Sequence, residues 1–327
     1  MTAVHAERLP LGKAINAGLA AAMAGDPKVV LMGEDIGKLG GVFRITDGLQ
    51  EQFGAARVID TPLAESGIIG TAVGLAFRGY RPVCEIQFDG FIYPAFDQII
   101  TQVAKLHYRT AGAVTMPLTI RVPYGGGIGA VEHHSESPEG YFAATAGLRV
   151  VTCSNASDAY WMIQQAIASD DPVLFFEPKR RYWEKGPVDA EPYPLHTARV
   201  VRSGTDLTLA AYGPLVTTAV QAAEVAQAEG RSIEVVDLRT LSPLDIDTLA
   251  ESVRRTGRLV VAHEAPVFMG LGAEISARIV EACFYHLEAP VQRVGGFATP
   301  YPPAKLESHY LPDVDRILDA ADRVFAA

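Results

Sequence analysis

A single carboxylate, Glu65, stands at the head of a run of small and apolar residues in DTPLAESGIIGTAVGLAFRGYRP, residues 60–82. The run lacks a polar stripe and predicts a helix buried all round. Thr61 or Asp60 could cap this helix, Pro62 suits its first turn, and an acid there complements the helix dipole. A buried carboxylate also needs a donor. Glu65 is therefore a candidate proton carrier, with a structural role at the helix start as the alternative.

The segment YGGGIGAVEHHSESPEG, residues 124–140, is rich in glycine. Gly125, Gly127 and Ala130 formally satisfy the Gly-x-Gly-x-x-Ala dinucleotide pattern. That pattern must open a helix, whereas the following residues have no apolar helical stripe and include Pro138. A flexible loop that lets the backbone approach a neighbour or a ligand is the simpler interpretation.

His133 and His134 follow the glycines directly. On an extended chain adjacent side chains point in opposite directions, so the two histidines make a poor joint metal-ligand set. Either could take a chemical role, since the loop permits a cleft, and a solvated structural histidine is the alternative. No HExxH, CxxC, GxSxG or Walker A sequence occurs, so metalloprotease, zinc-finger, esterase and P-loop functions lack support.

Alternating strand and helix patterns surround these residues and must position them. The strand candidates are KVVLMGED (28–35), RPVCEIQF (81–88), PLTIRVP (117–123), RVVT (149–152) and PVLFFE (172–177). Residues 94–109 predict a helix that starts at Pro94. Its core stripe would consist of Phe96, Ile99, Ile100, Val103 and Leu106.

Residues 178–197 carry four prolines and seven charged residues without a sustained period, which predicts an interdomain connection. Strands and helices alternate again beyond it, as in a smaller parallel α/β domain. We expect a first α/β domain over 1–185, a linker over 186–199 and a second domain over 200–327.

Composition bounds the possible functions of these 327 residues. The net charge of -10 opposes binding to nucleic acid, which requires clustered Lys and Arg. Cys84, Cys153 and Cys283 are widely spaced among apolar residues, so we expect buried free thiols in a reducing compartment. Neither a signal peptide nor an 18-residue apolar run occurs, so we expect a cytoplasmic protein that does not enter a membrane.

Several stretches together resemble the beta subunits of thiamine-diphosphate-dependent 2-oxo acid dehydrogenases, the decarboxylating component of the branched-chain and pyruvate complexes. These stretches are the Glu65 segment, FDGFIYPAFDQI, HHSESPEGYF, SDDPVLFFEPKR, EVVDLRTLSPLDIDT and HEAP. The resemblance runs from about residue 8 to the end of the chain. It implies a transketolase-like pyrimidine-binding domain, with a parallel sheet flanked by helices, followed by a smaller α/β transketolase C-terminal domain.

The resemblance also implies roles for individual residues. Glu65 matches the glutamate that hydrogen-bonds a ring nitrogen of the cofactor's aminopyrimidine and controls its tautomer. Leu63 and Gln87 match positions that line the pyrimidine pocket. Phe91 stands where many relatives have a tyrosine, so it can flank the ring but cannot donate a hydrogen bond. His134 matches a histidine that assists proton transfer during acyl passage to the lipoyl group.

Metal binding is implied in two forms. Some relatives hold a structural potassium ion, for which the matching positions here are Leu118, Thr119, Ala166, Ser169 and Asp171. The Gly-Asp-Gly and Asn-Asn segments that usually hold the magnesium and diphosphate are missing from this sequence. We therefore expect an alpha subunit to supply those ligands in an α2β2 heterotetramer, which docks to a lipoyl-bearing acyltransferase core.

The expected function is oxidative decarboxylation of a branched-chain 2-oxo acid followed by reductive acylation of lipoamide. Alternatives within the family are the pyruvate and acetoin dehydrogenase beta subunits. Two more distant alternatives are a split transketolase-like enzyme, which should carry a sugar-phosphate-binding cluster, and a non-catalytic interaction subunit. The presence of Glu65, Gln87 and His134 argues against the last of these.

Overall fold

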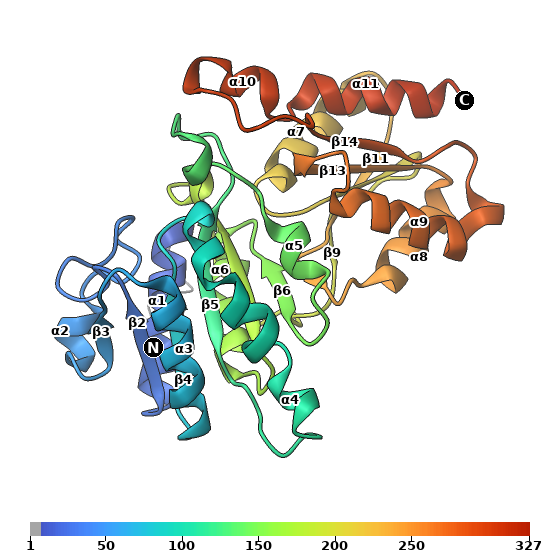
Figure 1. Ribbon diagram of the computed structural model, residues 1–327. Helices are drawn as coiled ribbons and strands as arrows, with labels where there is room; N and C mark the ends of the chain where they lie inside the picture. The colour runs from blue at the N-terminus through green and yellow to red at the C-terminus, as the bar shows by residue number, and fades with distance from the viewer. Residues whose placement is uncertain (1–7) are drawn as a thin grey trace. The chain divides into compact units, whose positions relative to one another are not determined.

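The computed structural model describes residues 8–327, and their contacts form two compact units (Figure 1). Unit 1 comprises the chain up to Tyr124 together with Tyr141–Leu195, and unit 2 comprises Gly125–Gly140 and His196–Ala327. The glycine-rich segment therefore groups with the C-terminal part of the chain, although no boundary in the sequence marks it. Among the described residues, no helix combines the length and the apolar character needed to cross a bilayer.

Unit 1 contains a parallel sheet with the strand order β6-β7-β5-β4-β2-β3. These strands are β2 (Val29–Gly33), β3 (Val58–Asp60), β4 (Arg81–Glu85), β5 (Thr119–Tyr124), β6 (Arg149–Thr152) and β7 (Val173–Pro178). The five predicted strands are confirmed, whereas β3 was not predicted because it is only three residues long. A separate antiparallel pair joins β1 (Leu9–Pro10) to β8 (Lys185–Gly186).

Helices cover both faces of this sheet (Figure 1). The helices of this unit are α1 (Leu11–Gly25), α2 (Leu49–Phe53), α3 (Glu65–Phe77), α4 (Leu106–Arg109) and α6 (Ala156–Ala168). The chain passes from one unit to the other within α5 (Glu139–Ala143). The apolar core under α1 and α6 includes Leu31. Its neighbour Met32 lines a hollow beside α3. Because successive strand residues face opposite ways, α3 covers the other face.

The helix predicted over residues 94–109 is wrong as a single element. The chain forms a 3₁₀ segment at Asp89–Ala95, a π-helical segment at Gln98–Val103 and the short α4. Ile99 and Val103 are fully buried, as predicted. Apolar spacing thus identified the buried side of the segment but not the backbone hydrogen-bond pattern, which changes twice within a few residues.

Unit 2 contains a five-stranded sheet with the order β14-β13-β10-β11-β9, in which only β9 is antiparallel. Its strands are β9 (Arg199–Arg202), β10 (Leu207–Ala211), β11 (Ile233–Asp237), β13 (Leu259–Pro266) and β14 (Gln292–Gly296); β12 (Thr240–Ser242) is a short strand of the same unit. Its helices are α7 (Leu215–Ala228), α8 (Ile246–Thr256), α9 (Leu271–Cys283), α10 (Glu307–Tyr310) and α11 (Val314–Phe325). The predicted alternation of strands and helices is confirmed, and the antiparallel edge strand β9 is an addition to it.

Three neighbouring strands of unit 1 are joined by a buried charged cluster. Arg121 on β5 donates from Nε to Glu177 Oε1 on β7 at 2.6 Å and from Nη1 to Glu85 Oε2 on β4 at 2.6 Å. The Tyr182 hydroxyl donates to Glu177 Oε2 at 2.5 Å. All four side chains are buried. Burial raises the pKa of Glu85, while the nearby Arg121 guanidinium lowers it.

Replacing Arg121 by Ala is expected to lower the free energy of unfolding at neutral pH by about 3–5 kcal/mol, because two buried carboxylates lose their cation. Burial raises the pKa of Glu85 in the folded chain, and the Arg121 guanidinium opposes that rise. Without Arg121 the pKa of Glu85 should rise further, so the folded variant gains more stability than the unmutated protein as the pH falls. The loss should therefore be smaller at about pH 5.5 than at about pH 7.5.

Urea denaturation at both pH values measures this effect, with Arg109→Ala, at an exposed arginine of α4, as the control. Equal losses for the two variants would show that the cluster does not stabilise the sheet.

Candidate functional site

Glu65 is the first residue of α3, and its side chain is 8% exposed. The predicted caps are wrong. Ala64 is the N-cap and offers no side-chain acceptor, while the Asp60 carboxylate accepts a hydrogen bond from Gly37 N at 2.6 Å instead. Within residues 8–327 no donor contacts the Glu65 carboxylate. A buried acceptor at the positive end of a helix is thus available to a ligand.

A second carboxylate, Glu34, lies close to Glu65 and was not predicted as a site residue. Glu34 directly follows β2, its side chain is 8% exposed, and its Oε1 atom is buried without a hydrogen-bond partner. Burial raises the pKa of Glu34, and the charges of Glu65 and Asp35 raise it further. The signal in the sequence was Gly-Glu-Asp directly after a buried strand, since parallel strands end where ligands bind.

Gln87 is connected to this pair. Its Nε2 atom donates to the backbone oxygen of Glu34 at 3.3 Å, so the Gln87 side chain is placed next to the end of β2. The structure therefore brings three groups together at the ends of β2 and β4 and the start of α3: Glu34, Glu65 and Gln87. Two are carboxylates and one is an amide, which together offer acceptors and a donor to a nitrogen-containing ring.

The other two predicted pocket residues lie differently. Phe91 is half-buried in the 3₁₀ segment and packs edge to face against Phe88, with 5.8 Å between the ring centroids. Leu63 is 79% exposed. The predicted all-round burial of α3 is also wrong, because Ser66, Thr71 and Phe77 are exposed on one side of the helix. The described chain thus forms a site with one open side.

His133 and His134 lie in unit 2, within a short 3₁₀ segment, Glu132–His134. Their rings meet edge to face with centroids 4.5 Å apart, so the two side chains do not point in opposite directions as an extended chain would require. Among the described residues, no group of three or more His, Cys, Asp or Glu side chains is arranged to hold a metal ion.

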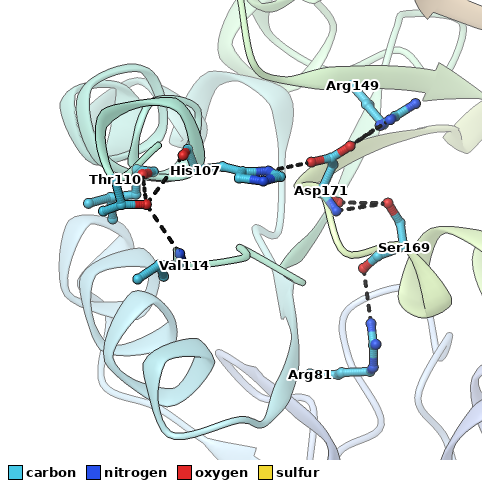
Figure 2. A network of polar contacts seen from close by, with 8 residues as sticks. Arg81, His107, Thr110, Val114, Arg149, Ser169 and Asp171 are labelled. Atoms are coloured by element: carbon cyan, nitrogen blue, oxygen red, sulfur yellow. Dashed lines mark hydrogen bonds and ion pairs between the residues drawn. The ribbon is translucent and has the colours of Figure 1, made fainter. Parts of the chain in front are cut away.

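Two of the residues matched to a potassium site, Ser169 and Asp171, lie in the turn between α6 and β7 (Figure 2). The Asp171 carboxylate accepts from Arg149 Nη2 at 2.5 Å and contacts His107 Nδ1 at 2.8 Å. The hydrogen bond from Arg149, followed by that from His107, holds the pKa of Asp171 below its usual value. The Ser169 hydroxyl donates to the backbone oxygen of Asp171 at 2.9 Å.

Arg81 also contacts this turn, and one of the matched oxygens, that of Ser169, accepts a hydrogen bond from it. Arg81 Nη1 donates to the backbone oxygens of Ser169 at 3.0 Å and Ile167 at 3.2 Å, and Nη2 reaches Asp170 at 2.8 Å. The Leu118 oxygen accepts from Val173 N at 3.0 Å. A further cation would be repelled by the guanidinium groups of Arg81 and Arg149. The two guanidinium groups beside Ser169 and Asp171 thus oppose the binding of a potassium ion, and the potassium site stays a prediction.

Two sequence families match the chain. The family described as "Transketolase, pyrimidine binding domain" covers residues 7–184, and "Transketolase, C-terminal domain" covers residues 196–317. A solved structure titled "Split gene transketolase, inactive beta4 tetramer" superposes with a TM-score of 0.80 over 97% of this chain and 98% of that chain. With 23% sequence identity, this likeness establishes the fold alone.

Several relatives are much more similar in sequence. "Pyruvate dehydrogenase E1 component subunit beta" of Leifsonia xyli subsp. xyli is 63% identical, over 98% of this chain and 96% of the relative. "3-methyl-2-oxobutanoate dehydrogenase subunit beta" of Mycobacterium tuberculosis is 56% identical over 97% and 92%. "2-oxoisovalerate dehydrogenase subunit beta" of Pseudomonas aeruginosa is 46% identical over 91% and 90%.

From these contacts we expect the positive charge of Arg81 to stabilise the turn between α6 and β7. Arg81→Gln should lower the free energy of unfolding by about 1–2 kcal/mol, because carbonyl groups lose a charged donor. Arg78→Gln, at an exposed arginine three residues earlier, is the matched control. The melting temperature of the unmutated protein should be equal in potassium chloride and sodium chloride. A potassium-specific rise would show that an ion binds the turn after all.

Proposed function

The chain belongs to the beta subunits of the 2-oxo acid dehydrogenases, and on this premise we propose that it forms half of a thiamine-diphosphate-dependent active site. The supporting observation is Glu65, a buried carboxylate without a donor among the described residues at the start of α3. Its neighbours Glu34 and Gln87 supply further polar groups. These residues fit the pyrimidine end of the cofactor.

When bound, the cofactor supplies a thiazolium ring that accepts the electron pair released as a 2-oxo acid loses carbon dioxide. Glu65 shares a proton with a ring nitrogen of the pyrimidine and thereby selects the tautomer that can act as a base. Burial, and then the charge of Glu65, raises the pKa of Glu34, so Glu34 holds a proton more readily than an exposed glutamate. Phe91 offers an aromatic face or edge to the pyrimidine ring.

The other half of the site is proposed to come from an alpha subunit. The sequence has no Gly-Asp-Gly segment followed by Asn-Asn to hold magnesium and diphosphate. An apolar hollow of about 480 Å³ lies beside α3, and Ile59, Ile68 and Leu75 are among its lining residues. Leu63 and Phe77, at either end of the same segment, are exposed. Exposed apolar surface of this kind supports contact with another chain in an α2β2 heterotetramer.

The proposed acceptor is the lipoyl group of an acyltransferase core. The carbon that loses carbon dioxide is oxidised to a thioester, and the lipoyl disulfide is reduced to one thiol and one acylated sulfur. His134 is proposed to move a proton to or from a lipoyl sulfur in this step, for which a histidine has a suitable pKa range in general. A subunit that only mediates interactions would not need His134 for proton transfer.

We propose a branched-chain 2-oxo acid as the substrate, supported by the relatives named for 3-methyl-2-oxobutanoate and 2-oxoisovalerate. Pyruvate is the second candidate, because the relative that is 63% identical carries that name. Both substrates would use the same residues of this chain for the chemistry, and they differ in the volume of the side chain that the pocket must hold.

Replacing Glu65 by Gln tests the proton-control role in the reconstituted complex with thiamine diphosphate and magnesium. Deuterium exchange at the thiazolium carbon should slow by about 100-fold, since the amide cannot share a proton with the pyrimidine in the same way. Glu51→Gln, at an exposed glutamate of α2, should leave the exchange rate unchanged. Equal rates for Glu65→Gln and the unmutated protein would refute this role.

A substrate panel with the same complex tests the branched-chain assignment. We expect kcat/KM for 3-methyl-2-oxobutanoate to exceed that for pyruvate by about tenfold or more, because a pocket for the branched side chain gains contact energy with each carbon. The opposite preference would assign the chain to the pyruvate type instead.

A further inference from the structure

The glycine-rich loop of unit 2 is held by two carboxylates that are remote from it in sequence. Gly127 N donates to Glu307 Oε1 at 2.8 Å, and Gly129 N donates to Glu307 Oε2 at 3.0 Å. Gly126 N donates to Glu264 Oε1. Glu264 lies on β13 and Glu307 is the first residue of α10; their side chains are 3% and 8% exposed. The glycines therefore bind protein carboxylates and not a dinucleotide phosphate.

The backbone conformation of the loop allows its amides to donate to the two carboxylates, an interaction called the capture of the loop below. Gly125, Gly127 and Gly129 have φ angles of 80°, 86° and 70°, which side-chain-bearing residues rarely adopt. Amides in such turns converge on one point and form a concavity that binds anionic oxygens. At Gly126 a Cβ atom would lie 1.7 Å from the Tyr301 hydroxyl oxygen. That hydroxyl donates to Glu307 Oε1 at 2.7 Å, so it also fixes the carboxylate.

Residues 126–129, which donate to the two carboxylates, are joined to the part of the loop that carries His134. Gly125 N donates to the backbone oxygen of Glu136 at 2.8 Å, which ties the two ends together. Within the loop, His134 N donates to the Val131 oxygen at 3.0 Å, and the 3₁₀ turn that carries the histidine starts at Glu132, three residues after Gly129. A change in the path of residues 126–129 must therefore displace the imidazole.

We propose that Glu264 and Glu307 are positioning residues that hold the loop 125–136 in the one conformation that presents His134 for acyl transfer. The proposal rests on the proposed role of His134 and adds the residues through which the C-terminal unit controls that role. Neither glutamate needs to touch substrate or cofactor. Their carboxylates act as fixed anions that replace solvent as the partners of the glycine amides.

Hydrogen exchange of the assembled heterotetramer tests the capture itself. In Glu307→Ala the amides of the peptide covering residues 125–137 should exchange about tenfold faster or more, because their charged acceptor is lost. Glu307→Gln should show a smaller increase, since one of its two side-chain termini becomes a donor and faces a backbone amide. Glu224→Ala, at an exposed glutamate of α7, is the control and should match the unmutated protein.

Two activity assays test the connection to His134. The first follows acylation of lipoamide, and the second follows decarboxylation with ferricyanide as an artificial electron acceptor. Glu307→Ala and His134→Ala should each lower the first activity by about 10- to 100-fold and leave the second within about threefold. The double variant should be no slower than His134→Ala alone, because both changes remove one function. A loss of general stability would reduce both activities together.

The outcomes separate the two ideas. Unchanged exchange of residues 125–137 in Glu307→Ala, or additive losses in the double variant, would overturn the positioning role. If His134→Ala alone lowers both activities equally, the proposed role of His134 is wrong and the positioning role falls with it, while faster exchange would still establish the capture. Faster exchange together with non-additive, acylation-specific losses supports the proposal.

Discussion

A buried carboxylate must be given donors, and this requirement organises both units of the chain. In unit 1 the Arg121 guanidinium donates hydrogen bonds to both Glu177 and Glu85. These bonds link β7, β5 and β4, the three neighbouring strands that carry the side chains. The segment that leaves β4 carries Gln87 and Phe91, two of the residues proposed to bind the cofactor. Because the cluster fixes the strands, that segment starts from a defined position, although a buried ion pair by itself contributes little net stability.

At the start of α3, in contrast, two buried carboxylates lack a cation as their partner among the described residues. Glu34 and Glu65 are buried close together, and the pKa of Glu34 is raised first by burial and then by the charge of Glu65. In the described part of the chain, neither Glu34 Oε1 nor the Glu65 carboxylate has a donor. Such an arrangement destabilises the free subunit and is retained where a ligand provides the missing hydrogen bonds. The two acceptors thus indicate a ligand that offers hydrogen-bond donors at this place.

Sequence patterns predicted the sheets well, because buried parallel strands are short apolar runs with clear ends. They failed where a residue's environment depends on distant parts of the chain. Asp60 is engaged by Gly37 and does not cap α3. The pairing of Glu34 with Glu65 was not predictable either, because the two residues are 31 positions apart in the sequence. The side chains that hold the glycine loop were not predictable, since Glu264 and Glu307 are 138 and 180 residues away from their partners.

The grouping of residues 125–140 with unit 2 has a consequence for how such chains can be divided or recombined. A cut at the linker, which the sequence alone suggests, would produce an N-terminal fragment that keeps the glycines and lacks both of their carboxylates. Exchange of C-terminal halves between homologous proteins would likewise require the loop and its acceptors to be inherited together. The natural unit of inheritance is therefore discontinuous along the gene.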